Sequence, residues 1–349
     1  MTDTTPIPTP SLQVLCLGEI LFDSISDELG VSIDQVQTWT HYPGGAPANV
    51  ACALSKLGSS AGFIGAIGQD GMGAALLEVL RSNQVSIAGV QLIPATPTRS
   101  VFVTRNAAGD RTFAGFANQR SSESFADTQL NADQLPVELI QSAQYLVTGT
   151  LLLAYPKSEA AVRRTLELAK AAGVNCVIDL NWRPVFWADE AIAKSKILDI
   201  IPQADYLKLT DEESQWLFGH EDVRKIRSKF PQLKAILMTK GAKGCRYWMA
   251  VREQGVVSDA IGEVPAFKVD VEDTTGAGDS FLAGFLHQLC LQDPDYVSPD
   301  VIRSIITYAS ATGALTTVKR GAIAASPTAA EVVAFLHLET LKARRSGQA

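Results

Sequence analysis

An α/β fold, with a mainly parallel central sheet between two layers of helices, is predicted from the order of patterns along the chain. From residue 140 onward, short apolar runs typical of buried strands alternate with longer segments of helical periodicity. Parallel strands need long crossover connections, so this alternation favours a parallel sheet with helices on both faces. We place strands at Tyr145–Thr148, Val174–Asp179, Tyr206–Leu209 and Ala235–Thr239, and helices at about 157–172, 189–200 and 211–229.

The N-terminal part begins with an apolar strand at Val14–Ile20 and continues with a second strand near Ala61–Ile67. Between them, Pro43-Gly44-Gly45 predicts a turn that leads into a helix of small residues over Pro47–Leu57. In the C-terminal part, phenylalanines and a leucine recur four apart on one stripe of a predicted helix over 278–291. Further helices are predicted over 71–81, 299–318 and 328–343.

A hairpin is predicted where two β-prone runs are joined by a polar turn. The runs are Arg99–Arg105 and Arg111–Phe116, and residues 106–110 separate them. The hairpin is too polar for the main sheet, so we place it in a small β lid built from roughly 21–42 and 98–118.

The composition excludes several classes of function. With 30 Lys and Arg against 37 Asp and Glu, the formal net charge is −7 and no basic block stands out, so no nucleic-acid partner is expected. No run of 18 apolar residues occurs, so no membrane partner is expected either. The five cysteines form no CxxC pair and the four histidines show no metal-ligand spacing, a pattern typical of reduced thiols in the cytoplasm.

Residues 11–343 are expected to form one large domain. The polar, Thr/Pro-rich residues 1–10 lack the basic and apolar parts of a signal peptide, which predicts a disordered leader. Residues 344–349 are expected to be a frayed tail. We therefore expect a cytoplasmic protein.

The stretch Asp273–Phe281 carries the most specific chemical signal. Gly276 and Gly278 flank Ala277 directly before a predicted helix, so backbone N–H groups and the positive helix end can approach an anion. Asp279 then lies beside this anion site, where it can accept a proton from an alcohol during phosphoryl transfer. Taken alone, the same pattern also fits a turn followed by a helix cap.

The chain resembles the ribokinase-like (PfkB) carbohydrate kinases at two separate signatures. Asp273–Phe281 resembles the second signature of that family, and Gly44–Ala51 resembles the first, in the family order. The resemblance implies a ribokinase-like three-layer sandwich with a small β lid, and ATP and Mg²⁺ as cofactors. It assigns Asp279 as the general base and Gly276, Ala277 and Gly278 as the anion hole.

The sugar-binding residues are implied by the same resemblance. Gly18–Asp23 resembles the first family strand, which ends in a sugar-binding aspartate, here Asp23. Gly44, Gly45 and Asn49 belong to the first signature and are expected to contact sugar hydroxyls. On the lid, Arg105, Arg111 and Phe113 are the candidates for sugar contacts. Because the lid often pairs two subunits in this family, a homodimer through the lid is also implied.

The same resemblance implies where the nucleotide and its metal ions bind: Thr239–Gly244 resembles the family's nucleotide-binding turn, and the loop at Gly321 resembles the segment near the adenine and a monovalent cation. Thr210–Glu213 resembles the family's Asn-x-x-Glu element, with Thr in place of Asn, and we expect Glu213 to bind Mg²⁺ through water. A monovalent cation such as K⁺ is placed at the backbone carbonyls of Asp273, Thr275 and Gly321. The expected nucleotide contacts are Lys208, Thr210, Glu213, Thr239, Gly241, Gly244, Gly278 and Ala322.

The sugar is inferred from a string at the end of a predicted strand. Asp179–Trp187 resembles the Asp-x-Asn-x-Arg…Trp string of fructokinases and 2-keto-3-deoxygluconate kinases, and Arg183 is placed on a phosphate oxygen. Lys208 lies where ribokinases usually carry Pro. We therefore predict a fructokinase, with a 2-keto-3-deoxygluconate kinase or a ribokinase as alternatives.

Other classes are disfavoured. No GxxxxGK[ST] motif and no HRD or DFG string is present, which excludes P-loop enzymes and protein kinases. A kinase-like partner protein without activity is disfavoured by the intact Asp279 and its glycines.

Overall fold

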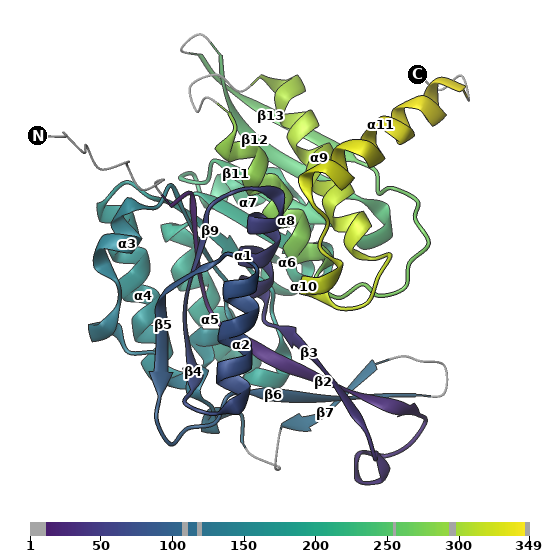
Figure 1. The fold of residues 1–349 in the computed structure, drawn as a ribbon. Coiled ribbons are helices and arrows are strands. Elements are labelled where there is room, and N and C mark those ends of the chain that lie inside the picture. The colour runs from purple at the N-terminus through teal and green to yellow at the C-terminus, as the bar shows by residue number, and fades with distance from the viewer. Residues whose placement is uncertain (1–11, 107–110, 117–120, 254–255, 293–297, 346–349) are drawn as a thin grey trace, which may run out of the picture.

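The computed structural model describes residues 12–345, except 107–110, 117–120, 254–255 and 293–297. Within this part of the chain, nine strands form the main sheet in the order β13-β12-β11-β10-β9-β8-β1-β4-β5 (Figure 1). In chain order they are β1 (Val14–Leu17), β4 (Ala61–Gly68), β5 (Ser86–Ile93), β8 (Tyr145–Thr148), β9 (Asn175–Asp179), β10 (Tyr206–Thr210), β11 (Ala235–Thr239), β12 (Cys245–Glu253) and β13 (Val256–Val264).

The main sheet is parallel from β5 to β11 and turns antiparallel only at β12 and β13. The prediction of a mainly parallel sheet is therefore confirmed. Three strands were not predicted, β5 and the β12–β13 hairpin. The hairpin lies at one edge of the sheet, where no crossover helix is needed because its strands run antiparallel.

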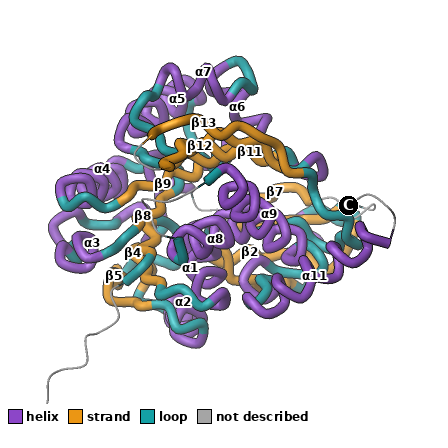
Figure 2. Tube along the Cα trace, turned by 90° about the horizontal axis from the view of Figure 1, so that it is seen from above, coloured by secondary structure: helices purple, strands orange, loops and turns teal. Residues whose placement is uncertain are grey.

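Helices cover both faces of the main sheet (Figure 2). Successive side chains of β8 enter different cores, with Val147 in one and Leu146 in the other, so both faces of this strand are apolar. One layer contains α1 (Ala46–Leu57), α2 (Gly71–Ser82), α8 (Ala277–Cys290), α9 (Pro299–Thr316), α10 (Ala322–Ala325) and α11 (Ala329–Arg345). The other contains α3 (Val137–Ser142), α4 (Pro156–Ala171), α5 (Glu190–Ile200), α6 (Asp211–Phe218) and α7 (Val223–Lys229).

Two expectations about helices need correction. The helix predicted over 211–229 is broken into α6 and α7, because Gly219 ends α6 in the left-handed conformation with φ +76°. The tail was predicted to begin at residue 344, but Arg344 and Arg345 still belong to α11. Their positive charges stabilise the helix because its C-terminal end carries the negative end of the dipole. The predicted leader, 1–10, and most of the hairpin turn lie outside the described residues.

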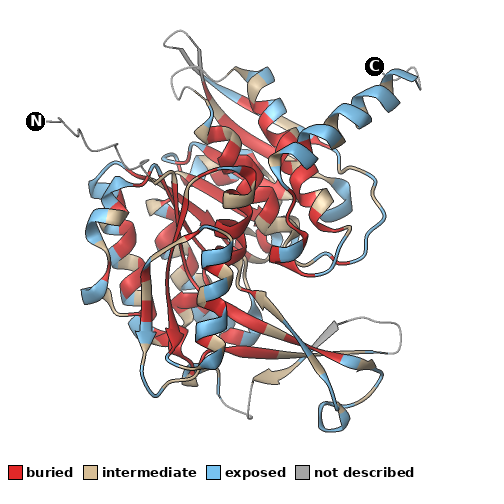
Figure 3. Cartoon of the chain, in the orientation of Figure 1, coloured by how far each residue is buried: buried red, intermediate tan, exposed pale blue. Residues whose placement is uncertain are grey.

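A second sheet lies to one side of the main sheet, at the bottom of Figure 1. This small sheet consists of β2 (Leu21–Leu29), β3 (Trp39–Gly44), β6 (Ser100–Arg105) and β7 (Arg111–Phe116), in the order β3-β2-β6-β7. The predicted hairpin is present, with β6 and β7 antiparallel, whereas β2 and β6 run parallel. Its buried residues lie toward the main body and its outer parts are more exposed (Figure 3).

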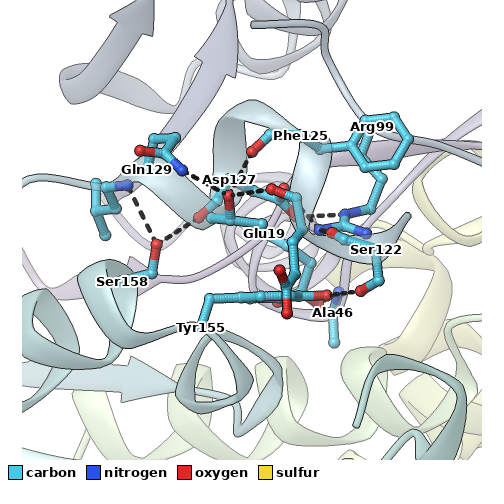
Figure 4. Close-up of polar contacts among 12 residues, drawn as sticks. Glu19, Ala46, Arg99, Ser122, Phe125, Asp127, Gln129, Tyr155 and Ser158 are labelled. Carbon is cyan, nitrogen blue, oxygen red and sulfur yellow. Dashed lines mark hydrogen bonds and ion pairs between the residues drawn. The ribbon is translucent and has the colours of Figure 1, made fainter. Parts of the chain in front are cut away.

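An ion pair anchors the small sheet to the body. Arg99 directly precedes β6, and its guanidinium donates to both carboxylate oxygens of Asp127, at 2.6 and 2.9 Å. Both side chains are almost fully buried, and aromatic rings surround the guanidinium, including Phe125 and Tyr155. Figure 4 shows this buried cluster beside Glu19 and Ala46. The pair therefore fixes the point at which the chain leaves the body for β6.

Short 3-10 helices complete the described chain. They are Ile33–Gln35, Ser122–Ser124, Ala126–Gln129, Ala132–Gln134, Leu151–Ala154, Pro184–Phe186, Ile201–Gln203 and Gly241–Lys243. None of the described helices combines the length and the apolar character that a membrane crossing requires.

Candidate active site

The first turn of α8 forms a nest of backbone N–H groups at the centre of the site. Gly276 is the residue before the helix and has φ +78°, a conformation that favours glycine. A β-carbon on Gly276 would overlap the side chain of Ala322 in α10, so the close packing of these two segments also requires glycine. Ala277 and Gly278 then place their N–H groups at the positive end of α8. The nest is therefore built to hold an anion.

Asp279 lies in the same turn and is joined to α1 by a side-chain hydrogen bond. Nδ2 of Asn49 donates to Oδ2 of Asp279 at 2.8 Å, across 230 residues of sequence. Asn49 is buried, and within the described residues its Oδ1 has no hydrogen-bond partner. The bond fixes one carboxylate oxygen of Asp279 and leaves an acceptor atom of Asn49 for a ligand hydroxyl.

A buried ion pair lies beneath the nest. Nζ of Lys208, in β10, contacts both carboxylate oxygens of Asp179, at the end of β9, at 2.9 and 2.8 Å. A β-carbon on Gly278 would lie only 3.0 Å from Nζ of Lys208. The ammonium group therefore lies directly under the anion nest and adds positive charge to it. Asp179 was not predicted as a functional residue, because its pairing with Lys208 depends on β9 and β10 being neighbours in the sheet.

The charges of the site shift the acid strength of its groups. Burial raises the pKa of Asp279 above its ordinary value, whereas Lys208 acts against this rise and Asp179 adds to it. Burial alone would lower the pKa of Lys208, but the carboxylates of Asp179 and Asp279 more than offset this, so that pKa is raised. Asp279 is consequently a stronger proton acceptor than an exposed aspartate, and Lys208 stays charged.

The predicted sugar residues of the N-terminal part meet at the end of the small sheet. Asp23 is in β2, and a β-carbon on Gly44 would lie 2.7 Å from its Oδ2. Gly45 has φ +103° and caps α1, which carries Asn49. Strand β2 pairs with β3, so the two segments approach one another through ladder hydrogen bonds. Asp23, Gly44, Gly45 and Asn49 are therefore brought together.

Glu213 has a positioning role that was not predicted, although Thr210-x-x-Glu213 is the sequence signature of a capping box. Thr210 caps α6: its hydroxyl accepts from the N–H of Glu213, while one oxygen of Glu213 accepts from the N–H of Thr210 at 2.7 Å. The other oxygen accepts from the N–H of Trp182 at 2.8 Å. Both oxygens thus hold the backbone around the Lys208 strand, and burial raises the pKa of Glu213. Its contact with Mg²⁺ through water stays a prediction.

The predicted nucleotide turn follows β11. Thr239 ends this strand, and Gly241 and Gly244 both have positive φ, of +52° and +97°. A β-carbon on Gly244 would overlap the backbone carbonyl of Val264, so the turn packs closely against β13. The turn lies at the same sheet edge as the end of β10, because β10 and β11 pair in parallel from Tyr206 to Thr210.

The three residues predicted to hold a monovalent cation are joined by one carboxylate. Oδ1 of Asp273 accepts from the backbone N–H and the hydroxyl of Thr275, at 3.0 and 2.7 Å. Its Oδ2 accepts from the N–H of Gly321 at 3.1 Å. The loop before α8 and the loop before α10 are therefore tied together, although the cation itself stays a prediction.

The predicted residues of the small sheet and of the segment after β9 separate into two groups. Arg183 is exposed, and its positive charge acts to lower the pKa of Asp279. Phe113 contacts Phe116 edge to face, and Phe116 contacts Phe186, close to Arg183. Arg105 instead donates to the backbone carbonyls of Ser26 and Asp27, at 2.9 and 2.8 Å, and so ties β6 to β2. Its contact with sugar stays a prediction.

The site suits the phosphates of a nucleoside triphosphate, but its described side chains do not form a complete set of metal ligands. The nest at Gly276–Gly278 and the ammonium of Lys208 suit phosphate oxygens. Among the described residues, no three His, Cys, Asp or Glu side chains lie close enough to hold an ion. Mg²⁺ is usually held by few carboxylates together with water and substrate phosphates, so a site for it would depend on the bound nucleotide.

Gly276→Ala should test whether the nest needs its unusual backbone. The fold holds this position at φ +78°, which costs an alanine about 1–3 kcal/mol, and the added β-carbon would also overlap Ala322. We expect a lower melting temperature and a kcat reduced at least about tenfold. Gly173→Ala is the matched control, because Gly173 has φ +77° with nothing within 4 Å. Thermal melts give the melting temperature and rate assays give kcat for both variants. An equal loss of kcat in Gly276→Ala and Gly173→Ala would contradict a specific role of Gly276.

Comparison with known proteins identifies relatives of the whole chain. A family model described as pfkB family carbohydrate kinase matches residues 11–329. A probable fructokinase-2 of Arabidopsis thaliana is 36% identical over 329 residues, which cover 93% of this chain and 96% of that protein.

Solved structures match over a similar length. A fructokinase from Xylella fastidiosa with bound ATP superposes with a TM-score of 0.82 at 26% identity, covering 95% of this chain and 99% of that one. A double mutant of the fructokinase from Vibrio cholerae O395, with fructose, ADP and a potassium ion bound, gives a TM-score of 0.75 at 27% identity, covering 93% and 99%.

Proposed function

We propose that this chain, which belongs to the pfkB family of carbohydrate kinases, transfers the γ-phosphoryl group of ATP to the 6-hydroxyl of D-fructose. Membership of the family makes the chain a sugar phosphotransferase, and its fructokinase relatives at 36% identity support fructose as the sugar. We assign the kinase domain to residues 11–343, with the small sheet as its lid.

One observation carries the proposal: the hydrogen bond between Asn49 and Asp279. It joins the two signature segments, 230 residues apart, at the anion nest of α8. A hydroxyl that donates to Oδ1 of Asn49 or to Asp279 would lie beside a phosphoryl group held in the nest. A carboxylate and an anion nest at one point are the two parts that phosphoryl transfer to an alcohol requires.

In the proposed reaction, Asp279 accepts the proton of the sugar hydroxyl as its oxygen bonds to the γ-phosphorus. The bond between this phosphorus and the β–γ bridging oxygen breaks, and ADP leaves with that electron pair. The N–H groups of Gly276–Gly278 and the ammonium of Lys208 stabilise the negative charge on the transferred group. The turn and the ammonium group are both formed before the sugar binds, and among the described residues only the long hydrogen bond from the N–H of Ala277 to the carbonyl of Thr274, at 3.3 Å, competes with the phosphoryl group.

The sugar would be held by the residues that meet at the small sheet. The carboxylate of Asp23 can accept hydrogen bonds from two hydroxyls, and Oδ1 of Asn49 can accept one more. Gly44 and Gly45 allow the backbone to approach the ring closely. Arg183 can then pair with a phosphate oxygen in the fork geometry of a guanidinium.

The metal ions have defined places in the proposal. Mg²⁺ would neutralise charge on the phosphates of ATP, with Glu213 in reach through water. A potassium ion would lie at the backbone carbonyls of Asp273, Thr275 and Gly321, which is supported by the potassium ion in the Vibrio cholerae relative. Its charge would support the anion nest from the side of α10.

We also propose a cytoplasmic homodimer that pairs through the small sheet. Leu29 and Phe113 in this sheet are 50% and 38% exposed, and Ile33 in the β2–β3 connection is 39% exposed. Burying such side chains against a second copy would stabilise a dimer. The lack of CxxC pairs and the free cysteines support a reducing compartment.

A second candidate, a 2-keto-3-deoxygluconate kinase, is favoured by one observation. The string Asp179–Trp187 is shared by both kinds of kinase, and Arg183 within it is exposed near the site. A guanidinium there could pair with a sugar carboxylate as well as with a phosphate.

Identification of the product tests the proposal. The enzyme is incubated with ATP, Mg²⁺ and D-fructose, and the product is examined by phosphorus–proton correlation NMR. We expect one sugar phosphate, with its phosphorus coupled to the two protons on C6. An absence of sugar phosphate, or a phosphate on another hydroxyl, contradicts the proposal.

A further inference from the structure

We propose that Glu19 is a positioning residue for sugar binding, whose ionised carboxylate holds the Gly44–Ala46 loop in the conformation that receives the sugar. Protonation of this carboxylate is then expected to weaken sugar binding without affecting ATP binding or the chemical step. The inference rests on the proposed fructokinase function and deepens it.

Three contacts join Gly18 and Glu19, which follow β1, to the Gly44–Ala46 loop and the start of α1. A β-carbon on Gly18 would overlap the ring of Pro47, and one on Gly45 would overlap the backbone carbonyl of Glu19. Oε1 of Glu19 accepts a hydrogen bond from the backbone N–H of Ala46 at 2.9 Å. This N–H is at the first residue of α1, where the helix itself supplies no acceptor. The side chain of Glu19 thus ties the start of the helix that carries Asn49 to the residues that follow β1.

The charges around Glu19 do not neutralise it. Glu19 is only 4% exposed, and the charged groups from other elements that shift its pKa are the carboxylates of Asp127 and Asp279, which both raise it. Arg99, which lies in the same cluster, has its guanidinium bound to Asp127 (Figure 4). The hydroxyl of Tyr155 is hydrogen-bonded to that of Ser122. Backbone N–H groups are therefore the main support for a negative charge on Glu19.

This environment places the titration of Glu19 close to neutral pH. Burial raises its pKa to about 7, its own N–H and that of Ala46 oppose the rise, and Asp127 and Asp279 add to it. Because the folded pKa lies above the unfolded value, protonation stabilises the fold below the unfolded pKa, and this stability is lost as pH rises through 7. The ionised carboxylate therefore lowers stability at neutral pH, as functional groups often do.

Glu19→Gln separates the charge from the shape. The amide oxygen can still accept from Ala46, but a hydrogen bond to a neutral acceptor is weaker than one to a carboxylate. We expect the KM for fructose to rise about fivefold at pH 8.5, where wild-type Glu19 is ionised. At pH 5.5, where wild-type Glu19 is protonated, the ratio of the two KM values should approach one. The melting temperature should rise at pH 8.5 and change little at pH 5.5.

The experiment measures kcat, the KM for fructose, the KM for ATP and the melting temperature of the wild type and of Glu19→Gln between pH 5.5 and 8.5. Glu159→Gln is the control, because the carboxylate of Glu159 on α4 is neutralised by direct ion pairs with Arg163 and Lys196. The KM for fructose of Glu159→Gln, divided by that of the wild type, should not change with pH.

Two results would overturn the proposal. The first is a ratio of KM values for Glu19→Gln that stays constant over the pH range. The second is a loss in kcat or in ATP binding while the KM for fructose is unchanged. Wild-type turnover of fructose is measured first, so an inactive wild type contradicts the proposed function and is distinguishable from both results.

Discussion

Asp279→Asn is expected to reduce kcat with D-fructose by about 10²–10⁴-fold, the usual contribution of a general base. The amide keeps the shape of the side chain but cannot accept the hydroxyl proton. It also removes a carboxylate beside the phosphates, so the dissociation constant for ATP should stay equal or fall. Calorimetric titration of ATP together with steady-state rates separates binding from turnover.

The pH profile gives a second readout for Asp279. The carboxylate must be ionised to accept a proton, and burial raises its pKa, so wild-type kcat should fall as the pH drops through this raised value. Asp279→Asn should lose that dependence. Asp189→Asn is the matched control, since Asp189 caps α5 and Asn caps equally well. A kcat for Asp279→Asn within about threefold of the wild type would remove this residue from its role.

Lys208→Met is expected to have the second-largest effect, on both stability and rate. It leaves the buried carboxylate of Asp179 without its partner, which typically costs about 3–5 kcal/mol of unfolding free energy. It also removes the positive charge beneath Gly278, so we expect kcat/KM to fall about 10²–10³-fold. The pKa of Asp279 should rise further, because Lys208 holds it down, and the acid limb of the rate profile should move to higher pH.

A double variant separates the two effects of Lys208. Lys208→Met combined with Asp179→Leu removes both charges and fills the space with apolar groups, so urea unfolding should show most of the stability restored. The rate should stay low, because the charge under the nest is still missing. If the rate recovers together with stability, the pair has only a structural role.

The strand ends were predictable from local pattern, and so were the groups that lie on them. Lys208, Thr210 and Thr239 belong to apolar runs that alternate with helices, and parallel strands bring their ends to one edge. The hairpin of β12 and β13 was not predicted. Its antiparallel strands need no crossover helix, so this part of the sequence lacks the alternation of strands and helices on which the prediction relied. The break at Gly219 was read as helix, since one glycine does not always end a helical pattern.

Contacts between distant segments could not be read from spacing. Nothing in the sequence shows that Asn49 donates to Asp279, or that Lys208 is paired with Asp179, because each depends on the order of strands in the sheet. The same holds for Glu19, whose partner, the N–H of Ala46, is a backbone group without a side-chain signature. Family resemblance identified the residue types at the site, whereas the structure gives the pairs that set their charge and orientation.

The choice of sugar is the central claim, and the rate of ADP release with different acceptors tests it most directly. We predict that kcat/KM is highest for D-fructose in a series with 2-keto-3-deoxygluconate, D-ribose and adenosine, each measured with saturating ATP and Mg²⁺. An equal or higher kcat/KM for any of the other three acceptors would contradict the assignment as a fructokinase.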